Sequence, residues 1–220
     1  MKTTIDTPHH AAAAIKNAMA REKPEADGRR ARSMASRSRI IEAMVELIAQ
    51  GDPNPSAAHV AKRAGIALRS VYRLFEDKES LLREIDDWLT RAYQPDLTRP
   101  FESGDWRERL YELIERRASM NEAIVVFRVS SQTARYTSDF VRDNYRRSMA
   151  REKRILNSVL PDPLKTDTRP GRALLIATNF DTWRFLRQDE ELSPQDTVRA
   201  IKELVDDIID RALRVTDVPS

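Results

Sequence analysis

The stretch SAAHVAKRAGIALRSVYRLFEDKESLL, which covers residues 56–82, has the spacing of two short helices joined by a tight turn. Ser56 can cap the first helix, because a serine side chain accepts a hydrogen bond from a free backbone amide there. Gly65 supplies the positive φ that ends this helix, and the small side chain of Ala61 lets a second helix cross closely. The spacing therefore predicts a helix-turn-helix.

Hydrophobic and polar side chains separate onto two faces of these helices. The inward positions are Val60, Ala61, Ala64, Ile66, Val71, Leu74 and Phe75. On the opposite side of the second helix, Arg69, Ser70, Tyr72 and Arg73 are free to reach a groove of duplex DNA. An ordinary helical hairpin would show part of the same pattern, so the charge distribution has to separate the two interpretations.

The positive charge of the chain is concentrated around the motif. Residues 28–79 hold ten Lys or Arg against six Asp or Glu, whereas residues 80–220 hold 24 against 25 and residues 1–27 hold four of each. A basic segment of this kind is the electrostatic footprint of contact with phosphates. The charge therefore favours a DNA-binding unit over a plain hairpin.

The composition argues against an enzyme. The chain has no cysteine and three histidines, His9, His10 and His59, so neither a thiolate metal site nor a serine-histidine triad in the larger part of the chain is expected. No glycine-rich phosphate loop occurs, and acidic pairs such as Asp206-Asp207 are interpreted as solvated charges. We expect no catalytic residue, no metal and no cofactor.

No apolar run is long enough to cross a membrane, and the early run Ala11 to Ile15 is shorter than the core of a signal peptide. We therefore expect a cytoplasmic protein with no membrane partner.

Few glycines and helical hydrophobic spacing predict an all-α fold. Besides the two helices of the motif, the expected helices are 36–49, 77–93, 105–120, 122–134, 139–160, 170–187 and 194–214. A loop over 94–104 follows the helix that Asp77 caps, and Ser193 caps the last helix. The expected domains are a flexible extension over 1–35, a helix-turn-helix domain over 36–80, and a larger helical domain over 81–220, to which the family resemblance described below assigns ligand binding and dimerisation.

The extension ends in an arginine-rich arm over residues 28–39, with five arginines and no acidic residue. Such a segment cannot form a core, so we expect it to be mobile and to contact phosphates or a minor groove. A solubilising tail is the alternative. At the other end of the chain, the last helix has a wide apolar stripe that suggests a partner chain, although it could also close the monomer's own core. The stripe is formed by Val198, Ile201, Leu204, Val205, Ile208, Ile209 and Leu213.

Residues 36–82 resemble the amino-terminal pattern of the TetR family of transcriptional regulators. Within it, the matching positions are Ser56, Ala61, Ala64, Gly65, Ile66, Val71, Tyr72, Phe75, Lys78, Glu79, Leu81 and Leu82. The resemblance implies a three-helix DNA-binding domain, a larger domain that binds a small-molecule effector, and a homodimer joined by the last two helices. It also implies a repressor that a ligand releases from a palindromic operator. A structural or ligand-independent DNA-binding protein is the alternative.

The resemblance implies that Ser70, Tyr72 and Lys78 contact operator phosphates. Arg69 and Arg73 are the expected base readers, because a guanidinium can bond two acceptors on a guanine edge. The chain departs from the family at Ala67, where a capping serine or threonine is usual, and at Arg69, where a small residue is frequent. The full set of expected DNA contacts is Arg29, Arg30, Arg32, Arg37, Arg39, Ser56, Leu68, Arg69, Ser70, Tyr72, Arg73 and Lys78.

Aromatic and polar residues of the later helices are candidates for an effector pocket, although ordinary core packing is the alternative for most of the aromatics. They are Trp88, Phe127, Arg128, Tyr136, Phe140, Asn144, Tyr145, Asn179 and Trp183. Arg128 interrupts an apolar run and would favour an anionic or carbonyl-bearing ligand if it faces a cavity.

Overall fold

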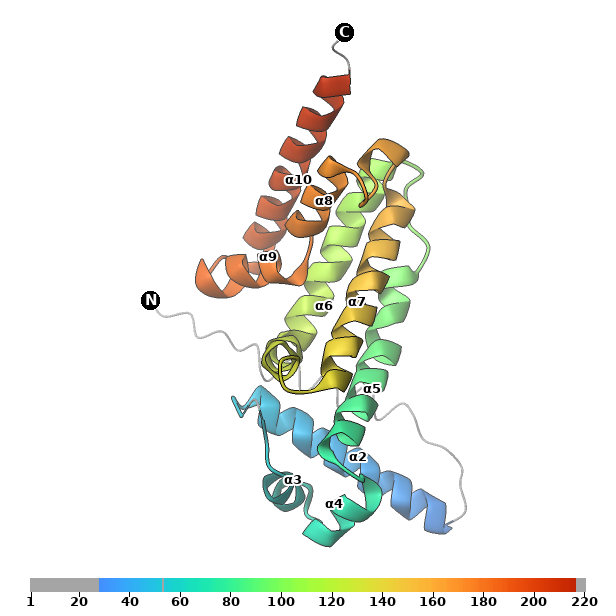
Figure 1. The fold of residues 1–220 in the computed structure, drawn as a ribbon, viewed down its shortest axis with the longest axis vertical. Helices are drawn as coiled ribbons and strands as arrows, with labels where there is room; N and C mark the ends of the chain where they lie inside the picture. Colours follow the sequence, from blue (N-terminus) through green and yellow to red (C-terminus); the bar gives the residue numbers. More distant parts are fainter. Residues whose placement is uncertain (1–27, 53, 217–220) are drawn as a thin grey trace. The chain divides into compact units, whose positions relative to one another are not determined.

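The structure is a computed structural model that describes residues 28–52 and 54–216. These residues form helices and connecting turns, with no strand among them, as Figure 1 shows. The α-helices are α2 (Gly28–Ala49), α3 (Ala57–Ala64), α4 (Leu68–Leu74), α5 (Lys78–Thr98), α6 (Trp106–Ala134), α7 (Asp139–Val159), α8 (Arg169–Ala177), α9 (Phe180–Arg184) and α10 (Pro194–Thr216). A 3-10 turn, η1 (Asp162–Leu164), precedes α8, and a π-helical turn, η2 (Phe185–Asp189), follows α9. The all-α prediction is therefore confirmed.

The described residues form two compact units, one with residues 28–52, 54–94 and 122–143, the other with residues 95–121 and 144–216. The boundary that we expect between residues 80 and 81 remains a prediction. In the described part of the chain, no helix combines the length and the apolar character that a membrane span requires.

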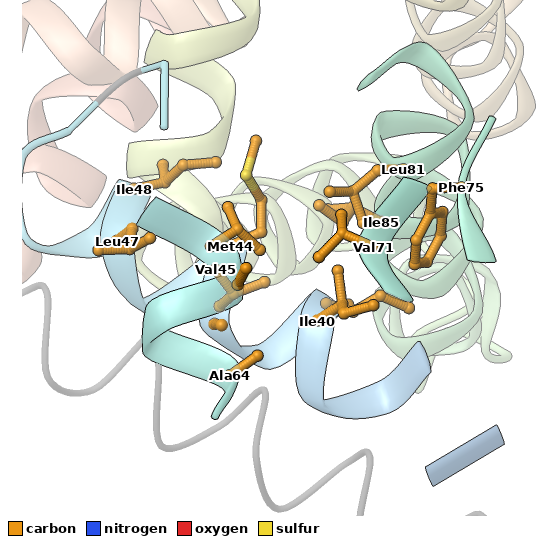
Figure 2. Close-up of a cluster of buried hydrophobic side chains, with 14 of the residues drawn as sticks. Ile40, Met44, Val45, Leu47, Ile48, Ala64, Val71, Phe75, Leu81 and Ile85 are labelled. Carbon is orange, nitrogen blue, oxygen red and sulfur yellow. The ribbon is translucent and has the colours of Figure 1, made fainter. Parts of the chain in front are cut away.

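The first unit is built around side chains from α2, α3, α4 and α5, which meet in one hydrophobic core (Figure 2). Ile40, Met44 and Leu47 of α2 recur at the three-and-four spacing of one helix face and are almost fully buried. Val71 of α4 and Phe75 just after it pack against the same face, together with Leu81 and Ile85 of α5, as Figure 2 shows. This core fixes the helix-turn-helix to the first helix of the domain.

The arginine-rich segment differs from our expectation of a mobile arm. Residues 28–35 belong to α2, which begins at Gly28 and not at residue 36. Ala31, Met34 and Ala35 favour a helix, and no proline interrupts the segment, so arginine repulsion alone does not unfold it. Arg32 Nε donates a hydrogen bond to the Gly28 carbonyl one turn earlier, at 3.0 Å. The prediction of a flexible extension is wrong over residues 28–35, while residues 1–27 lie outside the described residues.

Three further helix boundaries differ from the sequence prediction. Helix α5 continues through Pro95 to Thr98, because a proline removes one amide and does not by itself end every helix. Helix α6 is one helix of 29 residues without a break at residue 121, where the chain has neither glycine nor proline. The helix expected over 170–187 is split between α8 and α9, because the Asn179 side chain accepts a hydrogen bond from the Thr182 amide and starts a new helix.

In the second unit, hydrogen bonds and ion pairs join α6 to α10. The Tyr111 hydroxyl donates to Asp206 Oδ1 at 2.5 Å, and Arg107 pairs with the same oxygen at 2.9 Å. Burial of Tyr111 and its hydrogen bond to Asp206 raise the pKa of the Tyr111 hydroxyl. Asp206 is therefore a structural partner and not the solvated charge that its position on a polar face suggested.

Candidate nucleic-acid interface

Both ends of α3 are fixed as the sequence predicts. The Ser56 hydroxyl accepts a hydrogen bond from the His59 amide at 3.2 Å, so Ser56 is the amino-terminal cap. Gly65 has a φ of 65° and closes the other end, with its amide directed at the carbonyls of Ala61 and Lys62. A residue with a Cβ is strained at this φ, which explains the glycine. The turn places α4 directly after α3.

Helix α4 has an inner face and an outer face. Val71 is buried, and the Phe75 side chain, which follows the last turn, is 2% exposed. Leu68, Arg69, Tyr72 and Arg73 are exposed, and Tyr72 reaches 59% exposure although it is aromatic.

Arg69 and Arg73 have neither a hydrogen bond nor an ion pair with any residue that the structure describes. Their guanidinium groups keep their hydrogen-bond donors free for an external acceptor.

The amino-terminal end of α4 has no side-chain cap. Ala67 takes the extended backbone of a capping residue, with a φ of −68° and a ψ of 139°, but offers no acceptor to the first-turn amides. In α5, by contrast, the Asp77 carboxylate accepts from the Ser80 amide at 2.7 Å, which confirms Asp77 as the cap. The backbone of Lys78 begins α5, while its side chain lies outside the described residues.

The basic residues around the motif are not equivalent. Lys62 is exposed, whereas Arg63 is held at 3.3 Å from Glu46 and donates to Gln50 at 2.6 Å. In α2, Arg32 and Arg39 are exposed.

Arg37 differs from them, because its guanidinium is ion-paired with Glu84 of α5. The side chains of Arg29 and Arg30 lie outside the described residues. The expected DNA face therefore gathers on α4 and on the exposed arginines of α2.

The expected effector residues are distributed over both units. In the first unit, Phe127 lies in the core with the helix-turn-helix and Tyr136 is 75% exposed. Phe140 lies beneath the Arg83 guanidinium, whose carbon is 4.7 Å from the ring centroid. Arg128 is half-buried and has an interaction partner. The side chain of Trp88 lies outside the described residues.

The remaining candidates belong to the second unit. Trp183 is buried and stacks on Phe180 with the ring centroids 5.8 Å apart, which is ordinary core packing. Asn179 uses its side chain as the cap of α9, and Asn144 and Tyr145 are half-buried. Helix capping accounts for Asn179, whereas the Trp183 ring is buried with its Nε1 lacking a hydrogen-bond partner among the described residues.

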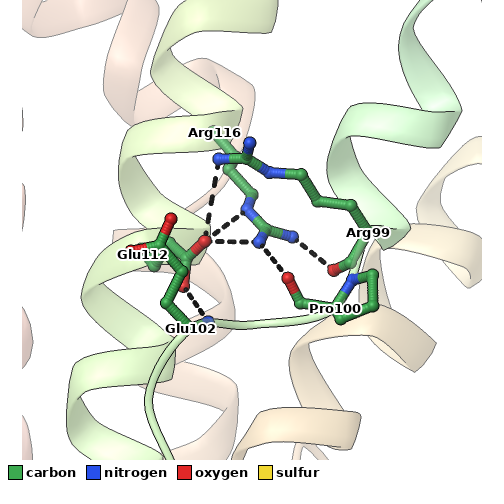
Figure 3. Close-up of polar contacts among 5 residues, drawn as sticks. All are labelled: Arg99, Pro100, Glu102, Glu112 and Arg116. Carbon is green, nitrogen blue, oxygen red and sulfur yellow. Dashed lines mark hydrogen bonds and ion pairs between the residues drawn. The ribbon is translucent and has the colours of Figure 1, made fainter.

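Two buried arginines in the middle of α6 escape the sequence analysis. Arg117 donates to Thr178 Oγ1 at 3.0 Å and to the Glu152 carbonyl at 2.7 Å. Arg116 donates to the carbonyls of Arg99 and Pro100, at 2.7 and 2.8 Å, and pairs with Glu112, as Figure 3 shows. The sequence held a signal, because Arg116 and Arg117 stand three residues after Leu113 and Ile114 and so continue an apolar helix face.

Glu112 is held in its charged form by this arginine cluster. Partial burial opposes the charge, but the Glu102 amide, Arg116 and Arg99 together outweigh it and lower the pKa of the Glu112 carboxyl from its ordinary value of 4.5. Glu112 accepts from the Glu102 amide at 3.1 Å (Figure 3). These contacts fasten the segment after α5 to α6 and are structural, not catalytic.

Comparisons with known proteins agree with this geometry. Residues 40–85 match the family model of bacterial regulatory proteins of the tetR family. The fold is similar to the crystal structure of a transcriptional regulator from Rhodococcus sp. Rha1, with a TM-score of 0.62 and 16% sequence identity over 81% of this chain and 96% of that chain. A search of curated proteins finds no significant match.

The capped α3, the glycine turn and the exposed cationic face of α4 define a helix-turn-helix DNA-binding protein. The family match covers this same segment, from Ile40 to Ile85. Residues 40–85 thus carry the DNA-binding segment of bacterial regulatory proteins of the tetR family.

Proposed function

We propose that this regulator is a repressor that binds a palindromic operator and is released from it by a small-molecule ligand. The observation that carries DNA reading is the outer face of α4, where Arg69 and Arg73 are exposed and unpaired within the described residues. A guanidinium with free donors can bond two acceptors of one guanine in the major groove. Tyr72, Ser70 and Lys78 would then contact phosphates and fix the register of α4.

Exposed arginines of α2 extend the proposed contact beyond α4. Arg32 and Arg39 are seven residues apart, so they lie on nearly the same side of a helix with 3.6 residues per turn. Replacing a phosphate-contacting arginine by glutamine should reduce the slope of log affinity against log salt by about 0.9. Arg32→Gln and Arg39→Gln therefore test this contribution one residue at a time.

We also propose a homodimer formed through α8 and α10. Large apolar side chains remain exposed on these helices of the second unit, with Ile176 of α8 63% exposed and Leu204 and Leu213 of α10 also exposed. Water contact with such side chains is unfavourable, so a second copy of the same surface would stabilise them. Two copies of α4 would then read two half-sites of one operator.

The proposed release step couples two sites on one chain. A ligand in the larger helical domain would shift α5, whose first turn packs in the same core as α4. A ligand that prefers the conformation with weak DNA affinity changes that affinity with a coupling of about 1–3 kcal/mol, and operator DNA weakens ligand binding equally.

Selection of bound duplexes from a random pool tests the proposal. We expect enriched sequences with two related half-sites in inverted orientation. Enrichment of single half-sites would contradict the dimer, and failure to enrich any sequence would contradict operator reading.

A ligand-independent DNA-binding protein is the alternative. A thermal-shift screen of small molecules, repeated with the selected duplex present, separates the two. A ligand whose affinity falls when the duplex is added supports the repressor, whereas duplex binding without any responsive ligand supports the alternative.

A further inference from the structure

One arginine of the arginine-rich helix α2 is turned toward the protein. Arg37 donates from Nε to Glu84 Oε1 at 3.0 Å, and its Nη2 lies 2.7 Å from the same oxygen. The guanidinium carbon is also 4.7 Å from the centroid of the Phe75 ring. A single side chain of α2 thus contacts α5 and the residue that ends α4.

The Glu84 carboxylate has Arg37 as its positively charged partner. The second oxygen of the Glu84 carboxylate, Oε2, is buried and has no hydrogen-bond partner among the described residues. A buried carboxylate oxygen is costly unless a nearby positive charge compensates it. The two side chains are 39% and 36% exposed, so the ion pair by itself is weak, but a phosphate that recruited Arg37 would also remove the only cation paired with Glu84 in the described residues.

Helix α4 needs support from outside itself. It has seven residues, which is shorter than the length at which an isolated helix is stable, and Ala67 gives its first turn no side-chain cap. Its orientation therefore depends on what fixes its two ends. The Ile66 amide bonds the Ala61 carbonyl at 3.1 Å before the helix, and the Phe75 amide bonds the Val71 carbonyl at 2.8 Å after it.

We propose that Arg37 is a positioning residue that holds the carboxyl-terminal end of α4 against α2 and α5, and that it does not contact DNA. The proposal rests on the proposed function, because it names α4 as the reading helix. Arg37 therefore has a different role from Arg32 and Arg39, although the three arginines look equivalent in the sequence.

The test compares Arg37→Gln with Arg39→Gln, a matched control on the same helix. Arg39 is exposed, and its side chain contacts the Ser36 hydroxyl at 3.5 Å. Affinity for a duplex obtained by selection is measured at several salt concentrations. We expect Arg37→Gln to weaken binding by roughly two- to thirtyfold with an unchanged salt slope. In Arg39→Gln the slope should fall by about 0.9.

A charge-reversed pair separates positioning from general stability. Arg37→Glu alone should weaken binding, and adding Glu84→Arg should restore much of the affinity, because the ion pair is rebuilt with the same net charge as the wild type. A salt slope reduced in Arg37→Gln would overturn the proposal, since it indicates a lost phosphate contact. Unchanged affinity in a variant that melts earlier would overturn it as well.

Amide hydrogen exchange gives a second readout that needs no DNA. Arg37→Gln should accelerate exchange of the amides at the end of α4, such as Val71 and Phe75, more than that of Val60 in α3. Uniform acceleration, or none, would contradict the proposal. Failure of the wild type to bind any duplex would instead contradict the proposed function. The exchange experiment would then still test whether Arg37 supports the end of α4.

Discussion

The Cβ atom that Gly171 lacks has no room in this fold. A Cβ built there would lie 1.8 Å from the Lys165 carbonyl oxygen and 2.5 Å from that of Leu164, both of which belong to the backbone. The Thr168 hydroxyl, which caps α8, accepts from the Gly171 amide and donates to the Lys165 carbonyl, so it joins these two segments. A glycine in the first turn of a helix is therefore a packing requirement here and not a flexible joint.

We expect Gly171→Ala to destabilise the protein by about 1–3 kcal/mol, because the backbone near Lys165 must move to accept the methyl group. Chemical denaturation measures the change. Gly104→Ala is the control, since nothing lies within 4 Å of a Cβ at that position and its φ is ordinary. Equal stability of the two variants would refute the close-packing account.

The lowered pKa of the Glu112 carboxyl makes the stability of the protein depend on pH. Its folded pKa is lowered, so its contribution to stability is complete above its ordinary value of 4.5 and disappears as the pH falls through the lower folded value. We expect Glu112→Gln to lose stability at neutral pH, with a gap to the wild type that narrows in acid. Denaturation midpoints between pH 7 and pH 3 measure the gap, and a gap independent of pH would contradict the prediction. Glu108→Gln removes a carboxylate from an exposed position of the same helix and serves as control.

At the scale of elements, α4 is the least self-sufficient helix of the DNA-binding unit. It has one buried residue, Val71, and its first turn lacks a side-chain acceptor, whereas α3 has Ser56 at one end and Gly65 at the other. Packing against α2 and α3 thus supplies order that the local sequence of α4 does not.

Ala67→Ser should stabilise the protein by about 1 kcal/mol, because the backbone of residue 67 already has the extended geometry in which a serine caps a helix. Ser56→Ala should cause a loss of similar size, since it removes the acceptor of the His59 amide. Thermal unfolding of the two variants measures the expected gain and the expected loss of stability. A destabilised Ala67→Ser protein would show that the first turn of α4 cannot use a cap.

At the scale of the whole molecule, the proposed dimer would bury apolar side chains that are exposed in the single chain. Ile176→Asp on α8 would place a charge in an apolar interface, and the dimer dissociation constant should rise about a hundredfold or more. Sedimentation velocity over a range of concentrations measures this constant. Val129→Asp alters another exposed apolar residue, on α6 in the first unit, and should leave assembly unchanged. A dimer unaffected by Ile176→Asp would place the interface elsewhere.

The DNA-binding unit could be predicted from the sequence because its signals are local. Ser56, Gly65 and Asp77 act within a few residues of their own positions, so their capping and turn roles are visible in the order of residues. The three-and-four spacing of Ile40, Met44 and Leu47 likewise marks a buried face without knowledge of its partner.

Side-chain partners far apart in the chain could not be predicted in this way. Arg37 and Arg39 look alike in sequence, but only the approach of α5 brings Glu84 to Arg37. The same limit applies to Asp206, whose partner Tyr111 lies 95 residues earlier, and to Arg117, which bonds groups on two distant helices. Periodicity identifies the face of a helix, whereas the tertiary fold decides what that face meets.

The sequence by itself determined the helical class, the reading motif and the concentration of positive charge around it, because capping, periodicity and charge are properties of neighbouring residues. Only the tertiary structure decided which arginines are exposed, which are ion-paired and which aromatic residues are core. Those outcomes depend on burial and on ion pairs across long separations in the chain, which arise when the helices pack.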